Sequence, residues 1–204
     1  LNRLTALRTG FGGITGLAAG DQFSDVTSWV QAFGSTADQN DRGGIAGFDI
    51  DSRGITFGID SAVTSNLRLG GAFSYSSTDV DTKGFNNNTD IDTYQGTLYG
   101  SLNHPGWYLD GSLSYAWSNS EGRRNIAFGA LNRTALADYD SNQFIAQATY
   151  GRDIRLDNDI IINPYVGLEY VNLDTEDYTE TGAGTLNLAV ASADTSALKS
   201  TVGV

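Results

Sequence analysis

The sequence contains no cysteine and no methionine, and among its 204 residues there are one histidine and two prolines. The lack of cysteine excludes disulfide bonds and thiolate metal sites. Basic residues are also scarce, since 12 lysines and arginines stand against 24 aspartates and glutamates, giving a net charge of −12. A nucleic-acid-binding protein needs a basic surface, so we expect no nucleic-acid partner. No apolar run approaches twenty residues, which excludes a transmembrane helix but not strands that cross a membrane.

The stretch W-Y-L-D-G-S-L-S-Y-A-W at residues 107–117 alternates apolar and polar residues with a period of two. This period predicts a β-strand. The apolar face has a tryptophan at each end, and Trp and Tyr concentrate at the two headgroup levels of a bilayer. Ten steps of about 3.3 Å, tilted by about 40°, climb roughly 25 Å, which is the height of the apolar band of an outer-membrane barrel. The stretch therefore predicts a membrane-crossing strand.

Seven more stretches alternate in the same way, so we predict eight strands. The others are residues 29–34, 45–60, 67–76, 92–102, 143–150, 160–170 and 197–204. Within residues 45–60 the apolar parity changes across Ser52-Arg53-Gly54, which predicts a bulge there. Leucines three apart in residues 1–8 predict a short helix that ends at Gly10, and residues 16–28 are interpreted as a connector.

The connections between these strands alternate in length along the chain. Residues 61–66, 103–106 and 157–159 are short, whereas residues 34–44, 77–90, 118–138 and 173–185 are long and rich in Asp, Asn, Gly, Ser and Thr. A soluble sandwich shares the apolar–polar alternation but has no reason for this asymmetry. Outer-membrane barrels have short periplasmic turns and long external loops. We therefore predict an all-β, antiparallel up-and-down transmembrane barrel, with long loops extracellular and the N-terminal linker entering from the periplasm.

Several motifs carry a resemblance to a known family, and their order is more specific than any one of them. They are W-V-Q-A-F-G at 29–34, G-I-T-F-G-I-D at 54–60, L-R-L-G-G-A-F-S-Y-S at 67–76, D-T-Y-Q-G-T-L-Y-G at 92–100, G-W-Y-L-D-G-S-L-S-Y at 106–115, residues 138–151, N-P-Y-V-G-L-E-Y at 163–170 and Y-T-E-T-G-A-G at 178–184. In this order the chain resembles the translocator (β) domain of autotransporters, the type V secretion family.

The resemblance implies a twelve-stranded barrel with a helical segment running through the pore to an N-terminal passenger. Residues 1–26 would be a linker with the end of the pore helix, and residues 27–204 the barrel domain. The barrel would carry and anchor its passenger at the surface of a bacterial outer membrane, with no cofactor and no catalysis of its own. Its partners would be outer-membrane lipid and lipopolysaccharide, its own passenger and the barrel-assembly machinery.

The chain departs from that family pattern because it stops inside the eighth predicted strand. Four strands and the aromatic C-terminal residue of similar barrels are absent. We expect the sequence to be a piece of a longer protein. The alternative is a small eight-stranded outer-membrane structural or adhesion barrel, whose lumen would be filled by side chains.

Strand parity assigns candidate wall residues to each face. A charge facing lipid at mid-depth costs about 2–4 kcal/mol for Arg or Lys, so charged positions are predicted to face the lumen. The lumen-facing candidates are Arg68, Gln95, Asp110, Ser112, Gln147, Glu169 and Lys199. The lipid-facing aromatic girdle is predicted to comprise Trp107, Tyr115, Trp117, Tyr150 and Tyr170.

No catalytic, cofactor or metal residues are predicted. His104 lies in a predicted turn without a second histidine to share a metal, and a lipid-acting barrel enzyme would need a Ser–His pair near the lipid boundary. Six aspartates lie near predicted loop margins, where they could form a calcium site or simply be solvated loop bases. The solvated interpretation is favoured because no EF-hand spacing is present. These residues are Asp49, Asp51, Asp79, Asp81, Asp90 and Asp92.

Overall fold

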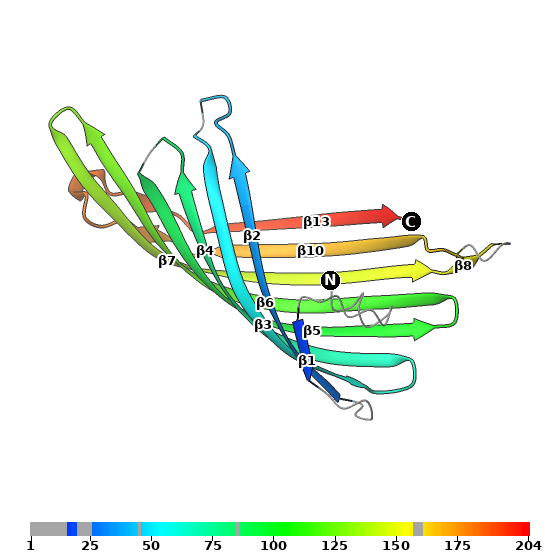
Figure 1. Ribbon diagram of the computed structural model, residues 1–204. Coiled ribbons are helices and arrows are strands. Elements are labelled where there is room, and N and C mark those ends of the chain that lie inside the picture. The colour runs from blue at the N-terminus through cyan, green and yellow to red at the C-terminus, as the bar shows by residue number, and fades with distance from the viewer. Residues whose placement is uncertain (1–15, 20–25, 45, 85, 157–160) are drawn as a thin grey trace.

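The computed structural model describes residues 16–19, 26–44, 46–84, 86–156 and 161–204. Nine strands form one antiparallel sheet in which spatial order follows chain order (Figure 1). They are β1 (Gly16–Ala19), β2 (Val26–Gln39), β3 (Phe48–Ala62), β4 (Leu67–Thr82), β5 (Asn87–His104), β6 (Trp107–Phe128), β7 (Leu131–Arg152), β10 (Tyr165–Thr175) and β13 (Ala193–Gly203).

Two small ribbons and one helical turn complete the described chain. β8 (Ile154–Arg155) pairs with β9 (Ile161–Ile162), next to the turn between β7 and β10. β11 (Tyr178–Thr179) pairs with β12 (Ala189–Val190), and the 3₁₀ turn η1 (Gly184–Leu186) lies between them. Across the described ranges, no helix is both long and apolar enough to cross a membrane. The predicted helix at residues 1–8 and the pore-helix end lie outside the described residues.

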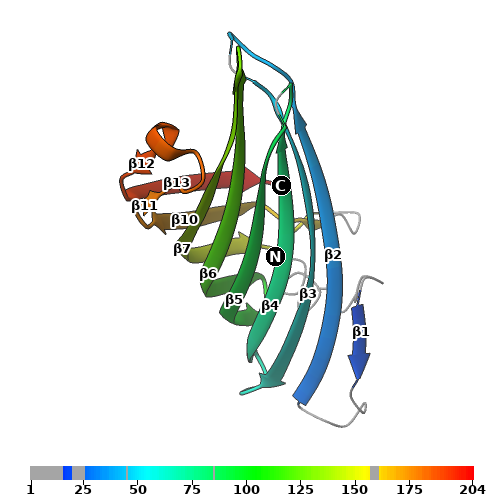
Figure 2. The same ribbon diagram turned by 90° about the vertical axis from the view of Figure 1, so that its left-hand side faces the viewer.

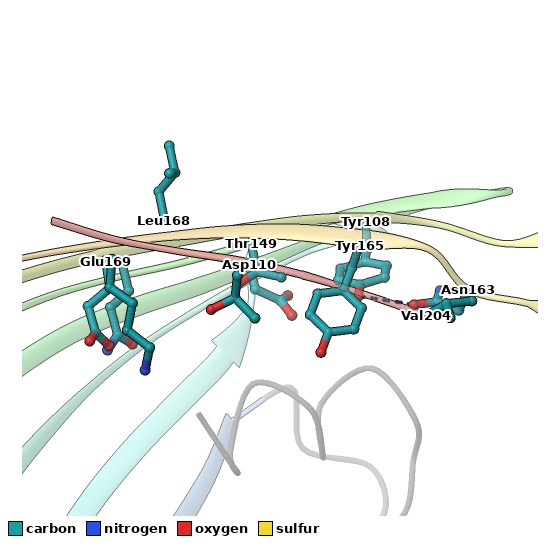
Figure 3. Close-up of a pocket in the computed structure, with 12 residues that line it drawn as sticks. Tyr108, Asp110, Thr149, Asn163, Tyr165, Leu168, Glu169 and Val204 are labelled. Carbon is teal, nitrogen blue, oxygen red and sulfur yellow. Dashed lines mark hydrogen bonds between the residues drawn. The ribbon is translucent and has the colours of Figure 1, made fainter.

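The sheet is strongly curved, so it has a concave and a convex face (Figures 1 and 2). Figure 3 shows Tyr108, Asp110 and Glu169 on the concave side, where the strands of the opposite end of the sheet lie, while Leu168 points away on the convex side. Exposure alternates along the strands accordingly: Tyr108 is 4% exposed, Leu109 43% and Asp110 5%. This alternation is the strand period that the sequence predicted.

The two ends of the strands differ in their connections. At one end, called the turn end, short links join β3 to β4 and β5 to β6; at the other, the hairpin end, β2–β3, β4–β5 and β6–β7 are joined. At the turn end the H-P-G sequence places Gly106 at φ 89°, in the left-handed region that the third position of a type II turn requires. The connections alternate between the two ends, but they are not sorted by length as predicted. Residues 63–66 at the turn end match residues 83–86 at the hairpin end, and β7 is linked to β10 at the turn end across residues 153–164.

Three of the four predicted long loops are mostly strand. β6 continues to Phe128 and β7 begins at Leu131, so residues 118–138 form a hairpin whose turn is only Gly129 and Ala130. The Asp, Asn and Ser composition of this region suggested a loop, but polar residues pair as well as apolar ones when both strands are already aligned below them. Residues 34–44 and 77–90 are likewise largely strand, in β2 and in β4–β5.

Two further predictions were wrong. β3 pairs residue for residue with β2 over residues 48–61 and with β4 over residues 48–62, so no bulge occurs at Ser52-Arg53-Gly54. The parity of apolar residues changes there because the convex face turns from apolar to polar, while Phe48 and Ile50 lie on the concave face. The predicted connector, residues 16–28, contains β1 and the start of β2.

The sheet is open, with β1 and β13 at its two edges. The alternative eight-stranded closed barrel would require β13 to pair with the first strands, and no such pairing is present among the described residues. The burial pattern is inverted relative to that of a water-soluble domain: the largest fully buried side chains are Asp60 and Ser101, whereas Leu98, Phe73 and Leu168 are more than half exposed. The convex face therefore presents apolar surface outward.

Candidate functional site

The convex face carries an apolar band bounded by aromatic side chains. Tyr75, Tyr94 and Trp117 are direct cross-strand partners on β4, β5 and β6, with ring centroids 5.2 and 5.8 Å apart. At the turn end, Trp107 packs on Tyr150 at 6.1 Å and stacks on His104 at 5.3 Å. All five predicted girdle residues lie on the convex face: Trp107, Tyr115, Trp117, Tyr150 and Tyr170.

Just beyond the Tyr75–Trp117 row, the convex face becomes acidic on five neighbouring strands. Asp51, Asp79, Asp90, Glu121 and Asp138 form one continuous cross-strand row. The six aspartates considered as calcium ligands lie within strands, and Asp49 and Asp81 are each one residue from the hairpin-end terminus of their strand. Among the described residues no group of three or more His, Cys, Asp or Glu side chains could hold a metal ion.

The concave face carries a polar row that crosses eight strands. Each member is the direct cross-strand partner of the next. We call this the polar row; it consists of Thr27, Asp60, Gly70, Tyr99, Ser112, Gln147, Glu169 and Lys199. Because the strands differ in length and spacing along the chain, only the register of the sheet brings these residues into line. The row lies at about the middle of the apolar band.

Asp60 is the centre of one cluster on this face. Its carboxylate, 1% exposed as a residue, accepts a hydrogen bond from the Arg68 Nε at 2.8 Å and another from the Tyr99 hydroxyl at 2.9 Å. The Trp29 Nε1 donates to the Tyr99 hydroxyl at 2.9 Å, and the guanidinium of Arg68 reaches the Thr27 hydroxyl at 3.2 Å. The charge on Asp60 is thus neutralised and hydrogen-bonded, as burial requires.

A second cluster surrounds Asp110, which accepts a hydrogen bond from the buried Ser101 hydroxyl at 2.6 Å. Next to it a cavity of about 550 Å³ opens on the concave face of β6, β7, β10 and β13 (Figure 3). Gln147 donates to Glu169 in its wall, and Lys199 lies directly across from Glu169. The cavity is lined by the carboxylates of Asp110 and Glu169, by neutral hydrogen-bond acceptors such as the Gln147 amide, and by the ammonium group of Lys199.

All seven lumen-facing candidates lie on the concave face. Four belong to the polar row, and Arg68 and Asp110 are in the next row toward the turn end. Gln95 lies farther toward the hairpin end, where its side chain donates to Thr97 at 3.0 Å. The seven residues are Arg68, Gln95, Asp110, Ser112, Gln147, Glu169 and Lys199.

Sequence reasoning missed Asp60, Tyr99 and Trp29. Asp60 follows Ile55, Phe57 and Ile59 on the opposite parity, so the alternation itself assigned it to the concave face. The alternation of residues 92–102 likewise assigned Tyr99 to the concave face, whereas the short stretch 29–34, which contains Trp29, had no clear phase. Each ring lies over a glycine: the added Cβ of Gly70 or Gly58 would overlap the ring opposite. An aromatic residue directly across from a glycine on the next strand is the sequence pattern that could have assigned these two rings to the concave face.

A model of the autotransporter β-domain matches residues 28–204. The chain belongs to the autotransporter β-domain family. This match covers nearly all of the described sheet, from Ser28 in β2 to the end of β13. It confirms the resemblance drawn from the motifs.

The similar sequences are much longer proteins. Outer membrane protein B of Rickettsia japonica is 27% identical over 185 residues, which cover 85% of this chain and 11% of that protein. Outer membrane protein A of Rickettsia rickettsii is 29% identical, covering 85% and 8%. An extracellular serine protease of Serratia marcescens is 25% identical, covering 88% and 17%. The chain thus spans about a tenth of the first of these, and the family is one of outer-membrane proteins.

Two solved structures share the fold. The translocator domain of the autotransporter NalP from Neisseria meningitidis superposes with a TM-score of 0.73 at 17% identity, covering 96% of this chain and 64% of that one. The β-domain of the Bordetella autotransporter BrkA gives 0.60 at 20%, covering 84% and 67%. The predicted fold class, an antiparallel β-barrel of the translocator type, is confirmed. Domains of this family are transport or structural barrels.

Proposed function

We propose that this autotransporter β-domain carries a passenger polypeptide across the bacterial outer membrane and anchors it at the cell surface, without catalysis of its own. The observation that supports this most directly is the division of the sheet between two faces. The convex face is an apolar band about as high as the hydrocarbon of an outer membrane, and the concave face carries the polar row. Such a wall can be wetted and can exchange hydrogen bonds with a chain that passes it.

The chemistry of the polar row suits transient contact. Asp60 is neutralised by Arg68, and Glu169 accepts a hydrogen bond from Gln147 and lies in register with Lys199. A passing segment would therefore meet hydroxyl, amide and paired ionic groups, none of which holds it tightly. The predicted facing of the named residues, lumen for the polar set and lipid for the aromatic set, is part of this proposal.

Orientation and partners follow from the same picture. The hairpin end would lie outside the cell, because its paired strands extend well past the Tyr75–Trp117 row and carry acidic side chains. The turn end would face the periplasm, from which a linker at residues 1–26 would enter. Outer-membrane lipid and lipopolysaccharide would contact the convex face, and the barrel-assembly machinery would insert the sheet.

The proposal can be tested by site-specific photo-crosslinking in the full-length protein. A crosslinker at Gln147 on the concave face should capture a passenger stalled in transit, whereas the same group at Ala148, its convex neighbour, should capture lipid instead. Protease treatment of intact cells should reach the passenger in an unstalled control. Equal passenger crosslinking from both positions, or a passenger that never becomes accessible at the surface, would contradict the proposal.

A further inference from the structure

The connection between β10 and β13, residues 176–192, does not project freely from the sheet. It contacts the β6–β7 hairpin through Arg124, Arg133 and Tyr139, which all occupy concave positions of that hairpin. Figure 2 shows β11, β12 and η1 gathered at one end of β10 and β13. The first residues of the connection continue along the edge of β7, where the Glu176 amide donates to the Asp140 carbonyl and Thr181 forms a bridge with Leu136. The side chains of Arg124 and Arg133 then hold the connection from the concave side, beyond the level of Trp117.

A bidentate ion pair holds this connection. Arg124 donates from Nε to the Glu180 Oε1 at 3.0 Å and from its terminal nitrogen to Oε2 at 2.5 Å, and also to the Leu186 carbonyl at 3.0 Å. The Glu180 side chain is 8% exposed and accepts a further bond from the Leu188 amide at 2.8 Å. The hydrogen bonds from Arg124 lower the pKa of Glu180, and the reciprocal bonds raise the pKa of Arg124. Bidentate charge-assisted bonds are the strong kind.

Smaller contacts complete the docking. The rings of Tyr178 and Tyr139 stack with centroids 4.4 Å apart and planes 12° apart. Leu136 and Thr181 exchange two backbone hydrogen bonds of 2.8 Å, and Arg133 donates to the Ala183 carbonyl at 2.7 Å. Ala135 and Ala183 are fully buried. Apart from the tyrosine pair these contacts are polar or involve small residues, so the connection can detach without exposing a large apolar surface.

We propose that residues 176–192 form a gate at the hairpin end of the lumen, held shut by the Arg124–Glu180 pair. The inference rests on the proposed function, because it takes the concave face as the wall of the path. A segment folded on that wall narrows the exit. The gate moves outward when a chain passes and closes again when Glu180 re-forms its ion pair with Arg124. When closed, it limits the leakage of solutes through the barrel.

The test is single-channel conductance of the full-length protein reconstituted in planar bilayers. Arg124→Ala should give a several-fold higher conductance with frequent flicker, and Glu180→Gln should behave in the same direction. The matched control is Glu176→Gln, an exposed acid of the same connection that has no ion pair among the described residues. The charge exchange of Arg124→Glu with Glu180→Arg should restore low conductance. Unchanged conductance in Arg124→Ala would overturn the gate.

A reversible lock separates gating from misfolding. The chain has no cysteine, and Leu136 and Thr181 form a hydrogen-bonded antiparallel pair, whose Cα separation of about 5.5 Å suits a disulfide. Leu136→Cys with Thr181→Cys, added to Arg124→Ala, should return conductance to the low level, and a reductant should raise it again. If the locked protein stays leaky, the connection is not the gate.

Surface display of the passenger, measured on the same cells, separates this inference from the proposed function. A wild-type protein that fails to display its passenger would contradict the translocator function. Normal display combined with a conductance that neither Arg124→Ala nor the lock alters would contradict the gate alone.

Discussion

The stretch of sheet between the two aromatic levels differs from the stretch beyond Trp117, although the same strands run through both. Along β6 the convex positions are Leu109, Leu113 and Tyr115 in the first stretch and then Asn119 and Glu121 in the second. The change happens at one cross-strand row on β3 to β7, at different sequence positions on each strand. Strand pairing therefore continues unchanged across this row, and only the side chains of the convex face change from apolar to polar.

The largest expected effect concerns the spanning stretch. Leu113 lies halfway between the aromatic levels on the convex face and is 54% exposed. Leu113→Arg should lower the stability of the assembled barrel by up to about 4 kcal/mol, since that is the cost of Arg near the bilayer midplane. Assembly would be measured by the heat-modifiable electrophoretic mobility of the protein in the membrane fraction. Ser112→Arg, one residue away on the concave face, should assemble; equal loss in both variants would refute the assignment of faces.

Ion pairs should differ between the two stretches as well. Asp60→Asn leaves Arg68 facing a neutral amide within the wall and should cost about 3 kcal/mol, the lower end for a broken buried pair, because Arg68 is 27% exposed. Asp38, whose carboxylate contacts Lys83 beyond the aromatic row, is 61% exposed. Asp38→Asn should leave the free energy of unfolding nearly unchanged, because exposed ion pairs contribute little to stability. Denaturant unfolding in lipid vesicles measures the loss of stability in both variants. A similar loss in Asp60→Asn and Asp38→Asn would show that the two stretches do not differ in their ion pairs.

The aromatic–glycine pairs of the spanning stretch provide a third test. A Cβ at Gly151 would overlap the ring of Tyr108, whereas a Cβ at Gly96, on the convex face, meets nothing within 4 Å. Gly151→Ala should therefore destabilise by about 1–3 kcal/mol through overpacking. Gly96→Ala should be neutral or slightly stabilising. Thermal unfolding of the two variants in the same detergent gives the comparison, and Tyr108→Ala should relieve the penalty at Gly151 if overlap is its cause.

Beyond Trp117, stability should depend on pH through Glu180. Its pKa is lowered in the folded protein, so its contribution is fully present above the ordinary value of 4.5 and disappears as pH falls through the lower, folded pKa. Arg124, whose pKa is raised, stays charged throughout this window. Near-ultraviolet circular dichroism of the Tyr139–Tyr178 stack should follow the acid transition. The transition should vanish in Glu180→Gln; if it persists there, another group controls it.

The smallest effect is expected in the acidic row. Asp79 lies directly between Asp51 and Asp90, and like charges in directly opposed positions destabilise a sheet. Asp79→Asn should stabilise by a few tenths of a kcal/mol, roughly, at low ionic strength, and the gain should fade in salt. Asp177→Asn, an exposed acid outside the row, makes the same change in net charge. Identical gains in both variants would show that net charge, not the row, is responsible.

Sequence reasoning predicted the parity of six strands, because an alternation such as that of Leu109 and Asp110 assigns successive side chains to opposite faces of a sheet. It left the phase of residues 29–34 open and misread that of residues 45–60. It could not predict the polar row, since register depends on the lengths of all intervening turns. It also failed beyond Trp117, where Asn119 to Asp138 were interpreted as a loop. There the convex face has no apolar residues to mark the strand period, and only pairing between β6 and β7 maintains the structure.

The glycines that lie under aromatic rings have a consequence for how strands find their alignment. Tyr108–Gly151, Tyr99–Gly70 and Tyr165–Gly203 all join strands whose connection is at the hairpin end, yet each pair lies near the opposite end. Strands joined at the turn end have their alignment fixed by the turn itself. The long hairpins have no such constraint there, and a two-residue slip would set each ring against a side chain. The ring-and-glycine pairs therefore fix the register of neighbouring strands at the end where their connection is too far away to exclude a two-residue shift.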